Sequence, residues 1–163
     1  MQNPRHTALW CGGLVLASGL FSRLYGCGVP LAALCAIAGL TLGPRLAFPL
    51  AVALVGVNTL ALGFSGWGWA GALLLIALAI AALPCVLPPR PWRPFAAFAL
   101  AVLVYEVGLA GAAWLLGGAG AFRLGQLALG FGQNLVAFLL LLAVWVLARR
   151  TVGQAAKPAR AVR

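Results

Sequence analysis

Residues 73–116 read LLLIALAIAALPCVLPPRPWRPFAAFALAVLVYEVGLAGAAWLL, and this stretch decides the fold. Its two apolar runs belong to the longer segments 68–87 and 95–117. Each is close to the ~20 residues that cross a bilayer as a helix. The segment between them, 88–94, holds four prolines and two arginines. Proline lacks the backbone donor that a helix interior needs, so this segment predicts a turn between two transmembrane helices.

The rest of the chain has the same apolar character. Hydrophobic residues make up 64% of its 163 positions and charged residues only 7%. An ordinary soluble domain carries about 25% charged residues. Eleven basic side chains and one acidic side chain are too few to cover a water-soluble surface of this size. The composition therefore excludes a soluble domain and predicts an integral membrane protein.

Glycine and proline positions divide the chain into apolar segments. The six predicted helices cover 8–24, 28–43, 46–64, 68–87, 95–117 and 126–148. They form one all-α transmembrane domain over 1–148, and the polar, basic tail 149–163 is expected to be disordered. The second segment is short, so the region 28–64 allows another division. Pro44 and Arg45 at its middle favour two helices.

Basic residues indicate the orientation of the helices. With six crossings, nine of the eleven lie on one side of the membrane and two on the other. The nine are Arg5, Arg45, Arg90, Arg93, Arg149, Arg150, Lys157, Arg160 and Arg163; the two are Arg23 and Arg123. The positive-inside rule then predicts a multi-pass protein of the bacterial inner membrane with both termini cytoplasmic. The lipid bilayer is its expected environment. No nucleic-acid partner is expected, because no basic face follows from this spacing.

Residues for catalysis are scarce. The chain has no aspartate, one glutamate and one histidine, His6, which precedes the first predicted helix. A carboxylate pair and a Ser-His-Asp triad are both excluded, so we expect no enzyme activity. The four cysteines form no CxxC pair, so we expect no metal site and no cofactor. The run 66–71 (GWGWAG) matches G-x-G-x-x-G, but it joins two membrane helices instead of a strand and a helix. Trp67 and Trp69 fit interfacial anchors there.

Polar residues inside the apolar helices are the candidates for ligand binding. Glu106 falls near the middle of its helix, where a lipid-facing carboxylate costs several kcal/mol, so we expect it to face inward. It is either a counter-charge for a ligand or a hydrogen-bonded group between helices. For the amides, hydrogen bonding between helices is the simpler interpretation. The candidate ligand-binding residues are Glu106, Asn58, Tyr105, Gln133, Asn134 and Trp67.

The first predicted helix has small residues at a spacing of four, namely Ala8 and Gly12, then Gly13 and Ala17. Such a face allows close helix contact, so we expect it to pack against another helix, within the chain or from a partner. Glycine and alanine are so frequent in this chain that the pattern is a weak signal alone.

Several stretches carry a family resemblance. They are 30–34 (PLAAL), 38–40 (AGL), 43–50 (GPRLAFPL), Asn58 and 62–64 (LGF). Together the segments resemble the substrate-binding S components of energy-coupling-factor (ECF) vitamin transporters. The likeness covers most of the chain as architecture and about residues 28–70 as sequence. Vitamin sites offer more hydrogen-bonding groups than this chain carries.

That resemblance implies a fold and a function. It implies six helices with cytoplasmic termini, and an outward-facing site that binds a vitamin or a metal ion for uptake. It also implies a coupling protein and ATPase subunits as partners. The small residues Ala8, Gly12, Gly13 and Ala17 would then form the docking face on the first helix.

A second family is also similar. The stretch 91–94 (PWRP), followed by Tyr105 and Glu106, looks like the second half of the rod-shape-determining membrane subunit of the cell-elongation machinery, as does the ending with Asn134 and Arg149-Arg150. That resemblance implies an assembly scaffold without a substrate, although the acidic residue usual in its third helix is absent. An accessory subunit of another membrane complex remains a third interpretation.

Overall fold

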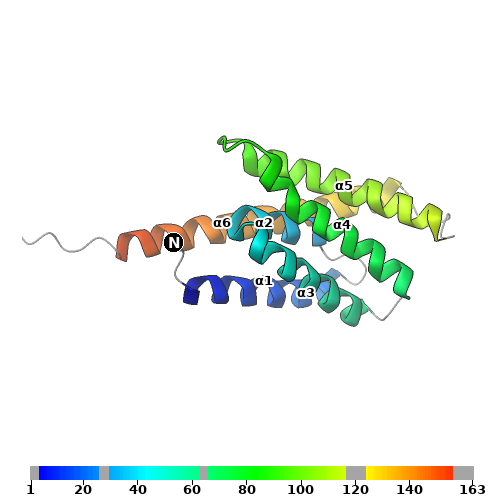
Figure 1. Cartoon of the computed structure of the whole chain (residues 1–163), viewed down its shortest axis with the longest axis horizontal. Helices are drawn as coiled ribbons and strands as arrows, with labels where there is room; N and C mark the ends of the chain where they lie inside the picture. Colours follow the sequence, from blue (N-terminus) through cyan, green and yellow to red (C-terminus); the bar gives the residue numbers. More distant parts are fainter. Residues whose placement is uncertain (1–3, 26–29, 63–65, 117–123, 156–163) are drawn as a thin grey trace, which may run out of the picture.

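A computed structural model describes residues 4–25, 30–62, 66–116 and 124–155, with side chains at 4–21, 30–60, 66–116 and 129–149. Helices account for nearly all of these residues, and no strand occurs among them (Figure 1). The helices are α1 (Pro4–Tyr25), α2 (Leu31–Leu42), α3 (Pro44–Leu62), α4 (Trp67–Val86), α5 (Arg93–Leu115) and α6 (Leu124–Ala155). The predicted all-α fold is confirmed for the described part of the chain.

Three of the helices are long and apolar enough to cross a membrane. They are α4, α5 and the part of α6 from Leu129 to Arg149. The protein therefore has the composition and helix lengths of a membrane protein. The last helix differs from its prediction, because it continues to Ala155 instead of ending at residue 148. Residues 149–155, expected in a disordered tail, are helical, and 156–163 lie outside the described residues.

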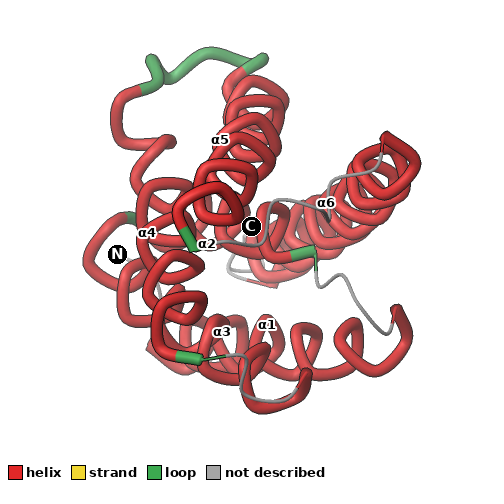
Figure 2. Tube along the Cα trace, turned by 90° about the vertical axis from the view of Figure 1, so that its right-hand side faces the viewer, coloured by secondary structure: helices red, strands yellow, loops and turns green. Residues whose placement is uncertain are grey.

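The helices run back and forth, so that the N-terminal end of α1 and the C-terminal end of α6 lie at the same end of the bundle (Figure 1). The short helix α2 lies at the centre. It contacts each of the other five described helices. Figure 2, which looks along the bundle, shows α4, α5, α6, α1 and α3 arranged around it.

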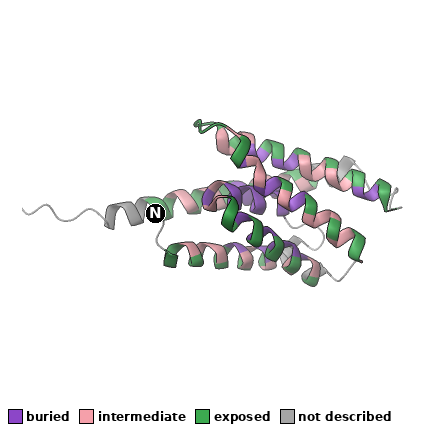
Figure 3. Cartoon of the chain, viewed as in Figure 1, coloured by how far each residue is buried: buried purple, intermediate pink, exposed green. Residues whose placement is uncertain are grey.

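The buried residues gather at the centre of the bundle (Figure 3), and small residues are frequent among them. Every residue from Leu31 to Gly39 is buried. Alanine recurs throughout the buried core, at positions 32, 33, 36, 38, 47, 51, 77, 81, 97, 101, 112, 113 and 137. Large exposed side chains such as Leu60 and Leu75 cover the outside. Lipid is as apolar as leucine, so small residues at helix contacts and leucines outside are the pattern that membrane helices use.

Gly39 shows how closely α2 and α4 approach. A Cβ atom added at Gly39 would lie 2.5 Å from the carbonyl oxygen of Ala81 and 3.0 Å from Cγ of Pro84. A contact of 2.5 Å with backbone cannot be relieved by a side-chain rotation. Glycine at this position therefore sets the distance between the two helix backbones.

The turn between α4 and α5 is closed by an arginine. Pro84 lies in the last turn of α4, and Pro88, four residues later, has no N–H to donate to its carbonyl group. The guanidinium of Arg93, in the first turn of α5, donates from Nη2 to the Pro84 carbonyl oxygen instead. A basic side chain at the C-terminal end of a helix also complements the helix dipole. The proline-rich segment thus ends α4 and leaves the Pro84 carbonyl oxygen free to accept a hydrogen bond from Arg93 of α5.

Candidate functional site

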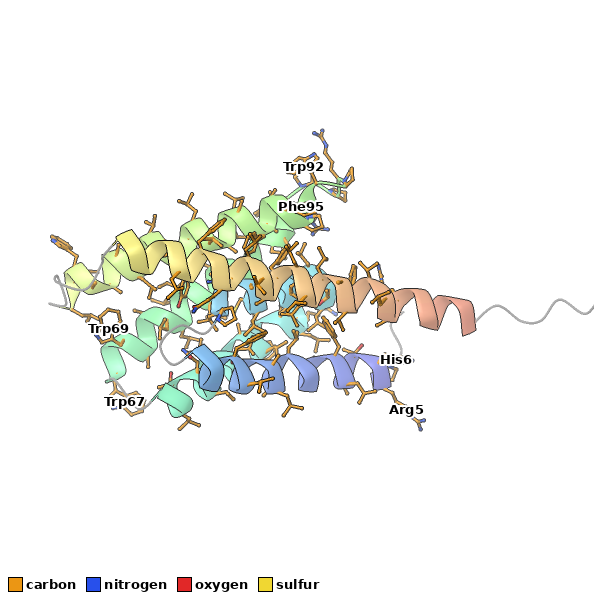
Figure 4. The ribbon with its side chains drawn as sticks, turned by 180° about the vertical axis from the view of Figure 1, so that it is seen from behind. Arg5, His6, Trp67, Trp69, Trp92 and Phe95 are labelled. Carbon is orange, nitrogen blue, oxygen red and sulfur yellow. The ribbon has the colours of Figure 1, made fainter. Side chains whose placement is uncertain are left out.

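The two ends of the bundle differ in their side chains. The N-terminal ends of α1, α3 and α5 and the C-terminal part of α6 lie toward one end of the bundle, which we call the arginine end (Figure 1). At or next to these helix ends are all the arginines with described side chains: Arg5, Arg45, Arg90, Arg93 and Arg149. Figure 4 shows Arg5 and Trp92 toward this end and Trp67 and Trp69 at the opposite end. Two of these arginines stack on tryptophan rings, with Arg149 4.5 Å from the Trp145 centroid and Arg90 6.0 Å from the Trp92 centroid. Tryptophan and arginine at helix ends are typical of membrane interfaces.

Four polar side chains lie far from the arginine end, inside the apolar part of the bundle. We call Ser18, Asn58, Glu106 and Asn134 the inner polar residues. Each shares a helix with an arginine of the arginine end, thirteen or fifteen positions away. The pairs are Arg5 and Ser18, Arg45 and Asn58, Arg93 and Glu106, and Arg149 and Asn134. At ~1.5 Å per residue the separations are roughly 20 Å, which is well inside a hydrocarbon layer of about 30 Å.

Asn134 joins α6 to the N-terminal end of α2. Its Oδ1 accepts a hydrogen bond of 3.1 Å from the backbone N–H of Ala33, and its Nδ2 donates over 2.9 Å to the carbonyl oxygen of Gly130. The first N–H groups of a helix have no partner inside the helix, and Pro30, the residue before α2, has no side-chain donor or acceptor. Asn134 therefore caps α2 from a helix a hundred residues away in sequence.

Asn58 is buried on α3, with an exposed fraction of 5%. Its Oδ1 atom has no hydrogen-bond partner among the described residues. A buried amide oxygen without a partner costs about 1–3 kcal/mol. Asn58 thus differs from Asn134, whose oxygen and nitrogen both have partners.

Glu106 is half-buried on α5 and points toward α6. Its Oε1 atom would lie 3.6 Å from a Cβ added at Gly130. The carboxylate therefore lies beside α6, and because it is only half-buried, its burial in the interior of the bundle stays a prediction. Of its expected partners, Asn134 lies on the same stretch of α6, but its amide is bonded to Gly130 and Ala33.

The contact between α5 and α6 is narrow, and we call it the α5–α6 seam: Phe98 and Glu106 on one side, and Gly130, Phe131 and Phe138 on the other. The Phe98 ring stacks on Phe138, with centroids 4.5 Å apart, and lies 6.3 Å from the Phe131 ring. α6 makes no contact with α1 or α3 within the described residues.

The remaining candidate residues, Tyr105, Gln133 and Trp67, lie on three different helices. Tyr105 is half-buried and packs against the core. Gln133 is half-buried next to Asn134. Trp67 is 85% exposed at the end opposite the arginines, as Figure 4 shows. Its place in the first turn of α4, after Gly66 with φ 104°, fits an interfacial anchor better than a ligand contact.

The small residues of α1 point away from the described chain. Ala8, Gly12 and Gly13 are exposed, and a Cβ added at either glycine would meet no described atom within 4 Å. Ala17 is half-buried. The buried residues of α1 are Leu14 and Ser18. Within the described residues, Gly12 and Gly13 thus pack against no other helix, whereas Ala17 packs against the core, and packing of this face against a partner stays a prediction.

Three polar residues, Ser18, Thr41 and Arg93, were missed in the sequence. Thr41 is buried on α2, where it accepts a hydrogen bond from Nε1 of Trp10 and donates one to the carbonyl oxygen of Ile37. Ser18 is fully buried, and Arg93 holds the α4–α5 turn. Ser18 carried a usable signal, because it stands in an apolar run at the same distance from an arginine as Asn58 and Glu106. No group of three or more His, Cys, Asp or Glu side chains is close enough to hold a metal ion in the described part of the chain.

Comparisons with known proteins identify no relative of this chain. No protein-family model, no curated protein and no solved structure matches this chain. The function has to be argued from the residues of the bundle.

Proposed function

We propose that this chain is a membrane-embedded component that binds a small molecule, such as a vitamin or a metal ion, for uptake, of the ECF S-component type. The observation that carries the proposal is the set of inner polar residues. They are placed in the apolar part of the bundle, where polar groups are costly and mark ligand or ion sites.

The short central helix supports this proposal. α2 has 12 residues and α4 has 20, so their lengths are about 18 Å and about 30 Å. α2 is thus too short to cross the bundle from end to end. Its N-terminal end is buried inside the bundle, close to Asn134. Transporters commonly place the N-terminal ends of such short or broken helices at a substrate site near the bilayer midplane, because the backbone N–H groups there bind polar ligands.

Six membrane crossings with both termini cytoplasmic belong to the same proposal. The gathering of Arg5, Arg45, Arg90, Arg93 and Arg149 toward one end supports it, since cytoplasmic ends carry excess arginine and lysine. A reporter enzyme that is active only in the periplasm, fused after residue 163, should be inactive. A fusion in the segment 117–123 should be active, and the reverse result would contradict the orientation.

The second candidate is a non-enzymatic scaffold subunit of a membrane complex, of the rod-shape-determining type. Its supporting observation is the filled interior around α2, where every residue from Leu31 to Gly39 is buried and Asn134 has backbone partners for both amide atoms. A scaffold needs packing of this kind and needs no ligand.

Ligand binding separates the two candidates. The purified chain in lipid nanodiscs should show a higher thermal unfolding midpoint with one member of a panel of water-soluble vitamins and divalent cations, because a bound ligand stabilises the folded state. Asn58→Leu should reduce this shift. Gly56→Ala, at an exposed position of the same helix with no atom within 4 Å, should leave it unchanged. No shift with any member, together with stoichiometric recovery in a membrane complex, would favour the scaffold.

A further inference from the structure

We propose that the α5–α6 seam binds an organic ammonium cation, with Glu106 as its counter-charge and Phe131 as an aromatic contact. This inference rests on the proposed small-molecule binding and names the class of ligand.

The first argument is the charge balance. Glu106 is the one acidic side chain in the sequence, against eleven basic ones. The arginines with described side chains lie toward the arginine end, and Arg93, on the same helix, precedes Glu106 by thirteen positions, or roughly 20 Å. Arg93 also donates to the Pro84 carbonyl. The described part of the chain therefore brings no cation to this carboxylate, and an external cation would complete the pair.

The second argument is that the seam is open. Glu106 and Gly130 are half-buried, and Phe131 is 47% exposed. The two helices contact each other nearer the arginine end, where the Phe98 ring stacks on Phe138. A side chain larger than glycine at 130 would approach the Glu106 carboxylate, since the added Cβ would already be 3.6 Å from Oε1. Glycine at position 130 thus leaves room on α6 beside the carboxylate.

The third argument is the chemistry of the lining. Phe131 follows Gly130 directly, and its ring lies 6.3 Å from the Phe98 ring. Of these two rings only Phe131 is exposed. A carboxylate with an exposed aromatic ring at the next position of the facing helix suits an organic ammonium group, because the ring face attracts the cation and the alkyl groups of the cation tolerate an apolar site. A hydrated metal ion would need several oxygen ligands, and Glu106 supplies a single carboxylate.

The uniqueness of Glu106 makes a direct test feasible. The purified full chain is reconstituted in liposomes and treated with dicyclohexylcarbodiimide, a lipid-soluble reagent that modifies carboxyl groups, and the peptide that holds Glu106 is analysed by mass spectrometry. Because the seam is open, Glu106 should be modified, and Glu106→Gln should lose that modified peptide. Absence of modification in the wild type would show a closed seam and overturn the inference.

Protection then tests the ligand class. Choline and tetramethylammonium should protect Glu106 in a saturable way, whereas 3,3-dimethyl-1-butanol, the uncharged analogue of choline, should not. Equal protection by the neutral analogue, or no protection by either cation, would overturn the inference. Phe131→Leu should raise the choline concentration for half protection by roughly fivefold. The matched change Phe95→Leu, at an exposed ring in the first turn of α5, should leave that concentration unchanged.

The outcome is separable from that of the proposed function. A vitamin or metal ion that stabilises the wild type and Glu106→Gln equally, without protection by ammonium ions, would leave small-molecule binding standing and refute the ammonium site. No stabilisation by any panel member and no protection would refute both.

Discussion

The helices α2 and α6 are both apolar, yet they have opposite places in the molecule. α2 is short and nearly all of its residues are buried, whereas α6 has 32 residues and most of its described side chains are exposed or half-buried. α2 contacts every other described helix, whereas within the described residues α6 contacts only α2 and α5. Side-chain size separates the two, because α2 offers alanines and Gly39 to its neighbours and α6 carries leucines outward. Both helices are apolar, so within this bundle the larger share of small residues in α2 distinguishes the central helix from the outer one.

Truncation of a leucine on each helix should give the largest contrast. Leu34→Ala removes a fully buried side chain of α2 and should lower the free energy of unfolding by about 2–5 kcal/mol, because a cavity remains. Leu140→Ala on α6, where the leucine is 55% exposed, should change it by less than about 0.5 kcal/mol. Unfolding in mixed micelles with a rising fraction of sodium dodecyl sulfate measures both values. Equal losses would show that a partner subunit or the bundle itself covers Leu140.

Glycine positions offer a second contrast of the same kind. Gly39→Ala should destabilise the fold by about 1–3 kcal/mol, since the new methyl group would meet backbone atoms of α4. Gly132→Ala, with no described atom within 4 Å, should be neutral or should stabilise α6 slightly, because alanine favours a helix. Thermal unfolding in one detergent, with size-exclusion profiles, compares the pair. A stable Gly39→Ala variant would contradict the close approach of α2 and α4.

The hydrogen bond from Ala33 on α2 to Asn134 on α6, the one polar link between them among the described side chains, should give the smallest effect. Asn134→Leu leaves the Ala33 N–H without its acceptor and should cost about 1–2 kcal/mol. Gln133→Leu, at the half-buried neighbouring position, is the matched control and should cost less. Hydrogen exchange at Ala33, followed by mass spectrometry, adds a local measurement: exchange there should become faster in Asn134→Leu and stay slow in Gln133→Leu. Equal exchange in both variants would refute the cap.

Much of the helix pattern was predictable from the sequence. Proline and glycine mark the helix ends, and the six expected segments correspond to the six helices within a few residues, except at the end of α6. The central place of α2 was not predictable. Every segment is apolar on all sides, so neither hydropathy nor periodicity distinguishes a buried helix from one that faces lipid.

The candidate site was predictable only in part. Asn58, Glu106 and Asn134 stand out as polar residues in apolar segments, and they are the inner polar residues together with Ser18. Their partners were not predictable, because Asn134 bonds to backbone groups and Glu106 lies beside a glycine. Contacts of this kind depend on helix crossing angles, which short-range sequence patterns do not encode.

The five arginines at one end also make the molecule sensitive to the electrical potential of its membrane. Each elementary charge moved across the bilayer changes in energy by ~2.3 kcal/mol for every 100 mV. Inversion of the bundle would carry Arg5, Arg45, Arg90, Arg93 and Arg149 through that field, at roughly 12 kcal/mol for 100 mV. With the arginine end on the negative side, an energised membrane therefore holds the protein in one orientation. The same field draws a cation that enters from the opposite end toward Glu106.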